Sequence, residues 1–180
     1  MSRMGPFKIF AASFALASLA LGGVALAQSP ISALRGHDTN APINVAADRI
    51  EVQDRADRAI WSGNVVVQQG QLTLSAQRLT LAYTTAGGLE IDRLDGSGGV
   101  TVRSPSETAR GDFGVYDVRR RTITLIGDVR LERGGSSLSG ARLTIDMNSG
   151  RAVVDGGAAG IGESGGRVTG RFLVPQRSGS

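Results

Sequence analysis

The chain has 180 residues, with 20 Lys and Arg against 16 Asp and Glu, no Cys, and His37 as its one histidine. This length suits a single domain, and a 41% apolar fraction is enough to bury a core. Without cysteine, disulfide scaffolds, thiolate zinc sites and thiol nucleophiles are excluded, and a serine–histidine–aspartate triad would need His37 as its base.

The first 27 residues have the order of a secretory signal peptide. Arg3 and Lys8 form a short basic start, an uncharged apolar run follows from Ile9 to Leu21, and Ala25-Leu26-Ala27 offers small residues at a cleavage position. A retained anchor is the alternative, because the 19 uncharged residues from Ile9 to Ala27 approach the ~20 that span a bilayer. The small residues favour cleavage, and the sequence therefore predicts export to a bacterial periplasm. Removal of this segment leaves 153 residues with 18 Arg, no Lys and a net charge of +2.

Residues 28–41 have no apolar periodicity and predict a flexible lead, whereas from Pro42 to about Val154 apolar and polar residues alternate. Successive side chains of a strand point to opposite faces, so each apolar pair two residues apart marks one apolar strand face. The 26 glycines also argue against a mostly helical domain. The apolar pairs are Ile43/Val45, Ile50/Val52, Val65/Val67, Leu72/Leu74, Leu79/Leu81, Leu89/Ile91, Val100/Val102, Val129/Leu131 and Leu143/Ile145.

Turn signals recur about every 8–12 residues, a spacing typical of a sandwich, barrel or β-roll built from hairpins. Beyond Gly156 the chain is rich in Gly and Ser, with one candidate for a last strand at Val168 to Val174 and a tail at 176–180 that is expected to be disordered. The turn signals are Asp54 to Asp57, Gly63-Asn64, Gln69-Gly70, Gly87-Gly88, Gly96 to Gly99, Gly127-Asp128, Gly134-Gly135 and Asn148 to Gly150.

Three segments resemble one another: residues 59–67, 94–102 and 122–131. Their valines at 65, 100 and 129 are 35 and 29 residues apart, and a repeat of that length indicates stacked supersecondary units, here of three or four short strands each. Such a stack has two open ends, whose unpaired N–H and C=O groups can pair with another chain.

No group of residues predicts catalysis or a metal site. The run Gly160 to Gly165 matches a dinucleotide-binding pattern, but only 15 residues follow it, too few for the acidic residue that this motif needs. The acid pairs Asp54/Asp57 and Asp92/Asp95 lie beside arginines and are interpreted as solvated turns, while His37 has no neighbouring partner in the sequence. Acidic and basic residues alternate and aromatic residues are few, so exposed sheet faces are expected in place of a nucleic-acid surface.

Two runs, Pro42 to Ile50 and Gly63 to Leu79, resemble the OstA-like family of LptA-type lipopolysaccharide-transport bridge proteins. The second Gly-Asp-Val at 127–129 and Leu173-Val174-Pro175 agree, so the resemblance covers about residues 41–175. It implies an all-β OstA-like β-jellyroll over 42–175, an open twisted roll of short antiparallel strands that follows the signal segment 1–27 and the lead 28–41. It also implies a protein without enzymatic activity, cofactor or metal, whose apolar interior receives acyl chains. The residues expected to line that interior are Ile43, Val45, Val65, Val67, Leu72, Leu74, Val102, Tyr116, Val118, Val129 and Leu131.

The resemblance further implies lipopolysaccharide, through its lipid A, as the ligand. An acyl chain of ~12 carbons costs roughly 9 kcal/mol to hold in water, so a carrier needs a long apolar lining. Implied partners are an LptC-like inner-membrane protein and an LptD-like outer-membrane translocon at the edge strands, and further copies joined head to tail. Two alternatives remain at this point. One is the anchored LptC-like component of the same pathway, which a mature terminus at Gln28 would disfavour. The other is a structural β-roll polymer whose interior is filled by its own side chains.

Overall fold

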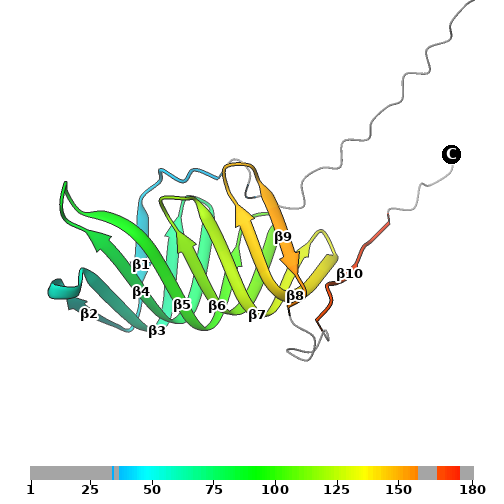
Figure 1. Cartoon of the computed structure of the whole chain (residues 1–180), viewed down its shortest axis with the longest axis horizontal. Helices are drawn as coiled ribbons and strands as arrows, with labels where there is room; N and C mark the ends of the chain where they lie inside the picture. The colour runs from blue at the N-terminus through cyan, green and yellow to red at the C-terminus, as the bar shows by residue number, and fades with distance from the viewer. Residues whose placement is uncertain (1–33, 35–36, 158–165, 175–180) are drawn as a thin grey trace, which may run out of the picture.

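The computed structural model describes residue 34 and residues 37–157 and 166–174, which form one antiparallel β-sheet with a single short 3-10 helix (Figure 1). The all-β class expected from the sequence is confirmed. No helix within these described ranges is long and apolar enough to cross a membrane. The elements are β1 (Ile43–Ala46), β2 (Arg49–Gln53), η1 (Asp54–Ala56), β3 (Arg58–Gln69), β4 (Leu72–Thr84), β5 (Glu90–Arg103), β6 (Glu107–Asp117), β7 (Thr122–Arg133), β8 (Ser136–Asp146), β9 (Arg151–Asp155) and β10 (Thr169–Arg171).

The strands follow the order β1-β3-β4-β5-β6-β7-β8-β10, while β2 also pairs with β3 and β9 also pairs with β8. Strands β3 to β8 are 11–14 residues long, and each takes part in two successive stretches of pairing. One stretch continues outward to β2 and β9, and the other continues to β1 and β10. We call these the β2–β9 half and the β1–β10 half. In Figure 1 the strands stand side by side, from β1 and β2 on the left to β9 and β10 on the right.

The boundary between the halves is a line of bulges inside the strands. The pairing register shifts between Ser62 and Val65 in β3, between Ser97 and Val100 in β5, and between Ile126 and Val129 in β7. At these points Gly63, Asn64, Gly98, Gly99, Gly127 and Asp128 have positive φ angles between 35° and 84°. Gly, Asn and Asp adopt this left-handed conformation most easily, and an extra residue there bends a strand without ending it.

The turns predicted at 63–64, 96–99 and 127–128 are therefore wrong, because these residues form bulges within β3, β5 and β7. Consequently the strands are longer and fewer than the expected short ones. The turn signals at 54–57, 87–88, 134–135 and 148–150 do fall between strands, and the signal at 69–70 begins at the last residue of β3. Strand β10 lies within the candidate last strand. The proposed signal segment 1–27 and the glycine pattern at 160–165 lie outside the described residues.

The sequence repeat corresponds to the odd-numbered strands β3, β5 and β7, each of which carries a bulge. The repeating unit is thus one hairpin of two long, bent strands, in place of three or four short ones. The first and third copies each place an aspartate against the glycine of the bulge. A Cβ atom at Gly63 would collide with the Asp48 carboxylate, and a Cβ atom at Gly127 would collide with that of Asp112.

Candidate functional site

The pairing register arranges apolar residues in stripes that cross the whole sheet. Directly opposed residues of an antiparallel pair point to the same face, so a ladder of such pairs forms a continuous stripe. Two stripes cross the β2–β9 half and one crosses the β1–β10 half. The first is Ile50, Trp61, Leu79, Gly96, Gly114, Leu125, Leu143 and Val154; the second is Val52, Ala59, Leu81, Leu94, Tyr116, Ile123, Ile145 and Ala152; the third is Val45, Val67, Leu74, Val102, Ala109, Leu131, Leu138 and Gly170.

All three stripes face one shared interior, where members of both halves belong to a single apolar cluster. The most deeply buried side chains, below 2% exposed, come from both halves, among them Leu79, Leu94 and Ile123 on one side and Val100 and Val129 on the other. Within the described part of the chain, the buried side chains that carry a polar or charged group include Gln69, Glu107 and Tyr116 with its hydroxyl. The interior is therefore apolar along its length.

The structure places the residues predicted to line a lipid site on this interior face. Five lie in the third stripe, and eight of the eleven are buried, while Ile43, Val45 and Val118 are half-buried and pack against the cluster. Their contact with lipid stays a prediction. The five in the stripe are Val45, Val67, Leu74, Val102 and Leu131. In the same half, Val65 and Val129 lie nearer the bulges, and Ile43 and Leu72 pair with Gln69 on either side. Tyr116 and Val118 belong to the opposite half.

Sequence reasoning missed most of the opposite wall. Leu79/Leu81 and Leu143/Ile145 show the same period-two signal as the predicted lining, and all four side chains are at most 6% exposed. The signal that marks an apolar strand face was present, but it does not reveal which faces confront one another. That assignment needs the register across the bulges.

The two halves approach each other closely beside the bulges. Val100 of the β1–β10 half lies against two glycines of the other half: a Cβ atom at Gly114 would come within 2.8 Å of its Cγ1, and one at Gly96 within 3.1 Å of its Cγ2. These two glycines let the halves approach closely, because they have no side chain at the point of contact. The stripe farther from the bulges carries larger side chains such as Leu94, Tyr116 and Ile123.

The apolar stripes extend to both open ends of the roll. At one end Ile50 and Val52 of β2 are 55% and 58% exposed, although they sit opposite Trp61 and Ala59 on the interior face. At the other end Ala152 and Val154 of β9 are half-buried and Gly170 of β10 is exposed. The interior surface is thus accessible at the ends of the roll.

A segment before β1, residues 37–41, hereafter the strap, runs beside the hairpin tips. Figure 1 shows this light-blue stretch passing from β1 along the strand ends toward the β8–β9 hairpin. Gln69 Nε2 donates hydrogen bonds to the carbonyl oxygens of Thr39 at 2.9 Å and Ala41 at 3.0 Å. His37, for which no partner was expected, places its Nε2 3.4 Å from Gln69 Oε1. Leu34, upstream of the strap, is 3% exposed and joins the core.

A hydrogen bond between Tyr116 and Gln69 crosses the interior between the halves. The Tyr116 hydroxyl, in the β2–β9 half, donates to Gln69 Oε1, in the β1–β10 half, over 2.8 Å. Burial raises the pKa of Tyr116 above its usual value, while the nearby charge of Arg121 acts in the opposite direction. Gln69 therefore links three parts of the molecule: the strap, its own half and the opposite half.

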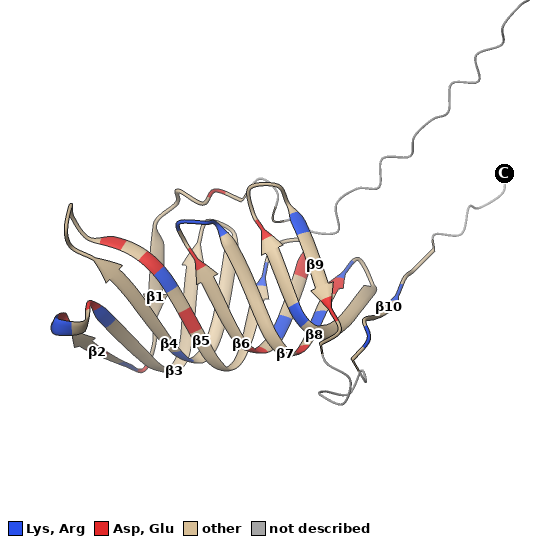
Figure 2. Ribbon diagram, in the orientation of Figure 1, with Lys and Arg blue, Asp and Glu red and all other residues tan. Residues whose placement is uncertain are grey.

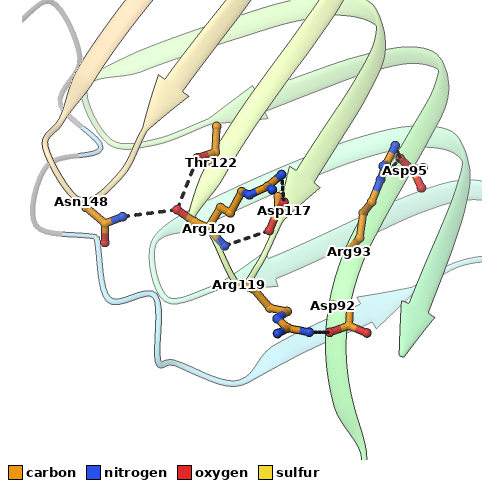
Figure 3. Close-up of polar contacts among 8 residues, drawn as sticks. All are labelled: Asp92, Arg93, Asp95, Asp117, Arg119, Arg120, Thr122 and Asn148. Carbon is orange, nitrogen blue, oxygen red and sulfur yellow. Dashed lines mark hydrogen bonds and ion pairs between the residues drawn. The ribbon is translucent and has the colours of Figure 1, made fainter. Parts of the chain in front are cut away.

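Apart from the buried Glu107, the charged residues in the described ranges are exposed or half-buried. The two signs are interspersed along the ribbon (Figure 2). Asp92 and Asp95, weighed above as an acid pair, bind arginines: Asp92 contacts Arg119 at 3.4 Å and Asp95 contacts Arg93 at 2.6 Å (Figure 3). Asp54 and Asp57 belong to η1 and its C-terminal cap. In the portion of the chain that is described, no cluster of three or more His, Asp or Glu could hold a metal ion.

Comparison with known sequences identifies one family and two relatives. The family model described as "LptA/(LptD N-terminal domain) LPS transport protein" matches residues 44–151. A protein of Rhizobium meliloti, itself uncharacterised, is 34% identical over 164 residues, which cover 83% of this chain and 88% of that protein. The lipopolysaccharide export system protein LptH of Pseudomonas aeruginosa is 27% identical over 127 residues, which cover 68% of this chain and 71% of LptH.

Among solved structures, the fold is similar to the crystal structure of Pseudomonas aeruginosa LptH, described as the LptA-homologous periplasmic component of the lipopolysaccharide transport device. The TM-score is 0.67 at 20% sequence identity, and the match covers 77% of this chain and 99% of that one. This likeness concerns the fold, and it agrees with the β-jellyroll expected from the sequence.

Proposed function

The chain belongs to the LptA/(LptD N-terminal domain) family of lipopolysaccharide transport proteins, and from this premise we propose that it is a periplasmic carrier that bridges the two membranes. The acyl chains of lipid A would lie between the two halves of the roll. The observation that carries the proposal is the set of three apolar stripes, which face one interior and reach both open ends. A carrier of this kind needs no catalytic group.

Acyl chains would enter by separating the two halves along the bulges. Each half keeps its own ladder of backbone hydrogen bonds, and the contacts between the halves are mainly between apolar side chains. Lipid chains can replace such contacts at little net cost, because both are non-directional and apolar. The Tyr116–Gln69 hydrogen bond is a polar contact that would have to break.

The edge strands supply the proposed contacts with partner proteins. β1 and β2 each pair with β3, and β9 and β10 each pair with β8, so the outer edge of each carries no partner strand within the described residues. Exposed edges of this kind favour strand addition from another chain. We assign the β1/β2 end to an LptC-like inner-membrane partner, the β9/β10 end to an LptD-like translocon, and both ends to head-to-tail contact between copies.

Site-specific photocrosslinking tests the carrier function. A photoreactive residue at Val45 or Leu131, which face the interior, is expected to crosslink to purified lipopolysaccharide. The same residue at the outward, exposed neighbours Asn44 or Arg130 should crosslink far less. Because each control lies one residue away on the same strand, it matches the probe in location and differs in the face of the sheet.

Equal labelling at inward and outward positions would indicate adventitious surface binding and would contradict the carrier function. No labelling at any of the four positions would leave the structural polymer as the better description. Far-ultraviolet circular dichroism of each variant establishes that the substituted proteins are folded.

A further inference from the structure

The turn between β6 and β7 brings three consecutive arginines, Arg119 to Arg121, to the hairpin tips beside the strap. Two of them are engaged with acids: Arg119 binds Asp92 and Arg120 binds Asp117, each at 3.4 Å (Figure 3). The third differs. Arg121 donates to the amide oxygens of Asn148, at 3.4 Å, and Asn40, at 3.2 Å, and forms no ion pair within the described residues.

The position of Arg121 is fixed by its turn. Its φ angle is +56°, a left-handed conformation that is uncommon for arginine. The backbone is held on both sides, because Met147 N donates to the Arg121 carbonyl at 3.0 Å and Asn148 Nδ2 donates to the Arg120 carbonyl at 3.3 Å. A residue kept in an unfavourable conformation by its surroundings is a candidate for a functional role.

Arg121 also lies where the apolar interior meets the surface. Its side chain is half-buried, and its charge acts on the Tyr116 hydroxyl, which is buried inside the roll. Its partner Asn40 belongs to the strap, which Gln69 holds beside the interior. A guanidinium in this place prefers an oxyanion to a neutral amide oxygen, because a phosphate adds the attraction of opposite charges and can accept two parallel hydrogen bonds.

We propose that Arg121 binds a phosphate group of an acylated ligand whose chains lie in the roll, and that this phosphate takes the place of the Asn40 side chain. The inference rests on the proposed carrier function and adds the residue that holds the headgroup. Release of Asn40 would loosen the strap as the lipid enters. Arg119 and Arg120 keep their carboxylate partners and contribute less.

Calorimetric titration of the purified protein with detergent-solubilised lipid A, in phosphorylated and dephosphorylated forms, tests this site. Arg121→Gln is expected to weaken binding of phosphorylated lipid A by about tenfold and to change binding of the dephosphorylated form less than about twofold. Arg119→Gln is the matched control, because it removes the same charge from the same turn. It should retain most of the affinity for the phosphorylated form.

A second variant, Asn40→Ala, removes the competing oxygen and should raise affinity for phosphorylated lipid A or leave it unchanged; a clear loss would contradict the competition. Equal effects of Arg121→Gln and Arg119→Gln, or an equal loss of affinity for both lipids, would overturn the site.

Titration with inorganic phosphate distinguishes the source of the anion. If phosphate alone binds through Arg121 while lipid A affinity does not depend on that residue, the site holds free phosphate and the headgroup assignment is wrong. If the unsubstituted protein binds neither lipid, the carrier function itself fails.

Discussion

Gln69 and Tyr116 are polar residues in an apolar interior, and their hydrogen bonds explain how they can be buried. Gln69 uses its amide nitrogen for two carbonyl oxygens of the strap, and its amide oxygen accepts from the Tyr116 hydroxyl. A buried polar group without partners would cost several kcal/mol, whereas a satisfied one fixes the geometry of its neighbours. These two residues therefore set the distance between the halves on the side away from the bulges.

Replacing Tyr116 with Phe should change how stability depends on pH. Burial raises the pKa of the Tyr116 phenol above its ordinary value of 10.0, so the folded state binds this proton more tightly than the unfolded state. The stabilisation of the folded state that follows from this raised pKa is fully present below pH 10. It is lost as the pH rises through the higher pKa of the folded state. The Phe variant lacks this alkaline loss, but it also lacks the hydrogen bond and should be about 1 kcal/mol less stable at pH 8.

Urea denaturation of both proteins between pH 8 and pH 11 measures this difference. The gap in unfolding free energy should be largest at pH 8 and should narrow above pH 10. A gap that stays constant over the whole range would mean that Tyr116 does not titrate differently in the folded state.

At the scale of the element, the long strands β3, β5 and β7 are each two short strands joined by a bulge. Gly63-Asn64 and Gly127-Asp128 look like hairpin turns in the sequence, because Gly, Asn and Asp favour positive φ in turns and bulges alike. Asp48 and Asp112 lie against the glycines of these bulges, where a side chain would not fit. The bulges thereby let one continuous sheet supply both walls of the interior.

Substitution of a bulge glycine should destabilise the protein according to what the new methyl group meets. Gly99 and Gly127 have similar φ angles, +84° and +81°, but a Cβ atom at Gly99 meets nothing within 4 Å, whereas one at Gly127 collides with Asp112. Gly99→Ala should cost about 1 kcal/mol from backbone strain alone. Gly127→Ala should cost roughly 2–4 kcal/mol, because Asp112 must move as well. Equal costs, measured by thermal or urea unfolding, would show that the contact with Asp112 is unimportant.

At the scale of the whole molecule, the decisive property is that the roll does not close. The sheet has edge strands at both ends, and the interior face at the β2 edge still carries exposed apolar residues. A closed barrel would have no such edges, and a monomer that needed no partner would be expected to cover them. The open ends are consistent with a molecule that is extended by further units.

Charged residues at the β2 edge should weaken head-to-tail association without harming the fold. In the double variant Ile50→Lys and Val52→Lys, both positions are more than half exposed, so little packing is lost. The two charges would face the apolar stripe of an adjoining copy, and we expect self-association to weaken by about tenfold or more. Sedimentation velocity over a range of concentrations measures the association.

Phe113→Lys is the matched control for this pair. Phe113 is 55% exposed, like Ile50, but it lies on β6 in the middle of the sheet, away from both ends. An equal effect of the control would indicate nonspecific repulsion between charged copies and would count against the open ends as the interface.

The sequence by itself determined the strand content, the apolar face of each strand and the family, because alternation and short motifs depend only on neighbouring residues. Val45, Val67 and Leu74 could be assigned to one face in this way. Only the tertiary structure decided that residues 63–64 and 127–128 bend strands instead of ending them. It also decided that Leu79 and Leu143 lie opposite the predicted lining and that Asn40 contacts Arg121. These features depend on register and on contacts between residues up to 81 positions apart, and no local pattern specifies which distant residues will meet.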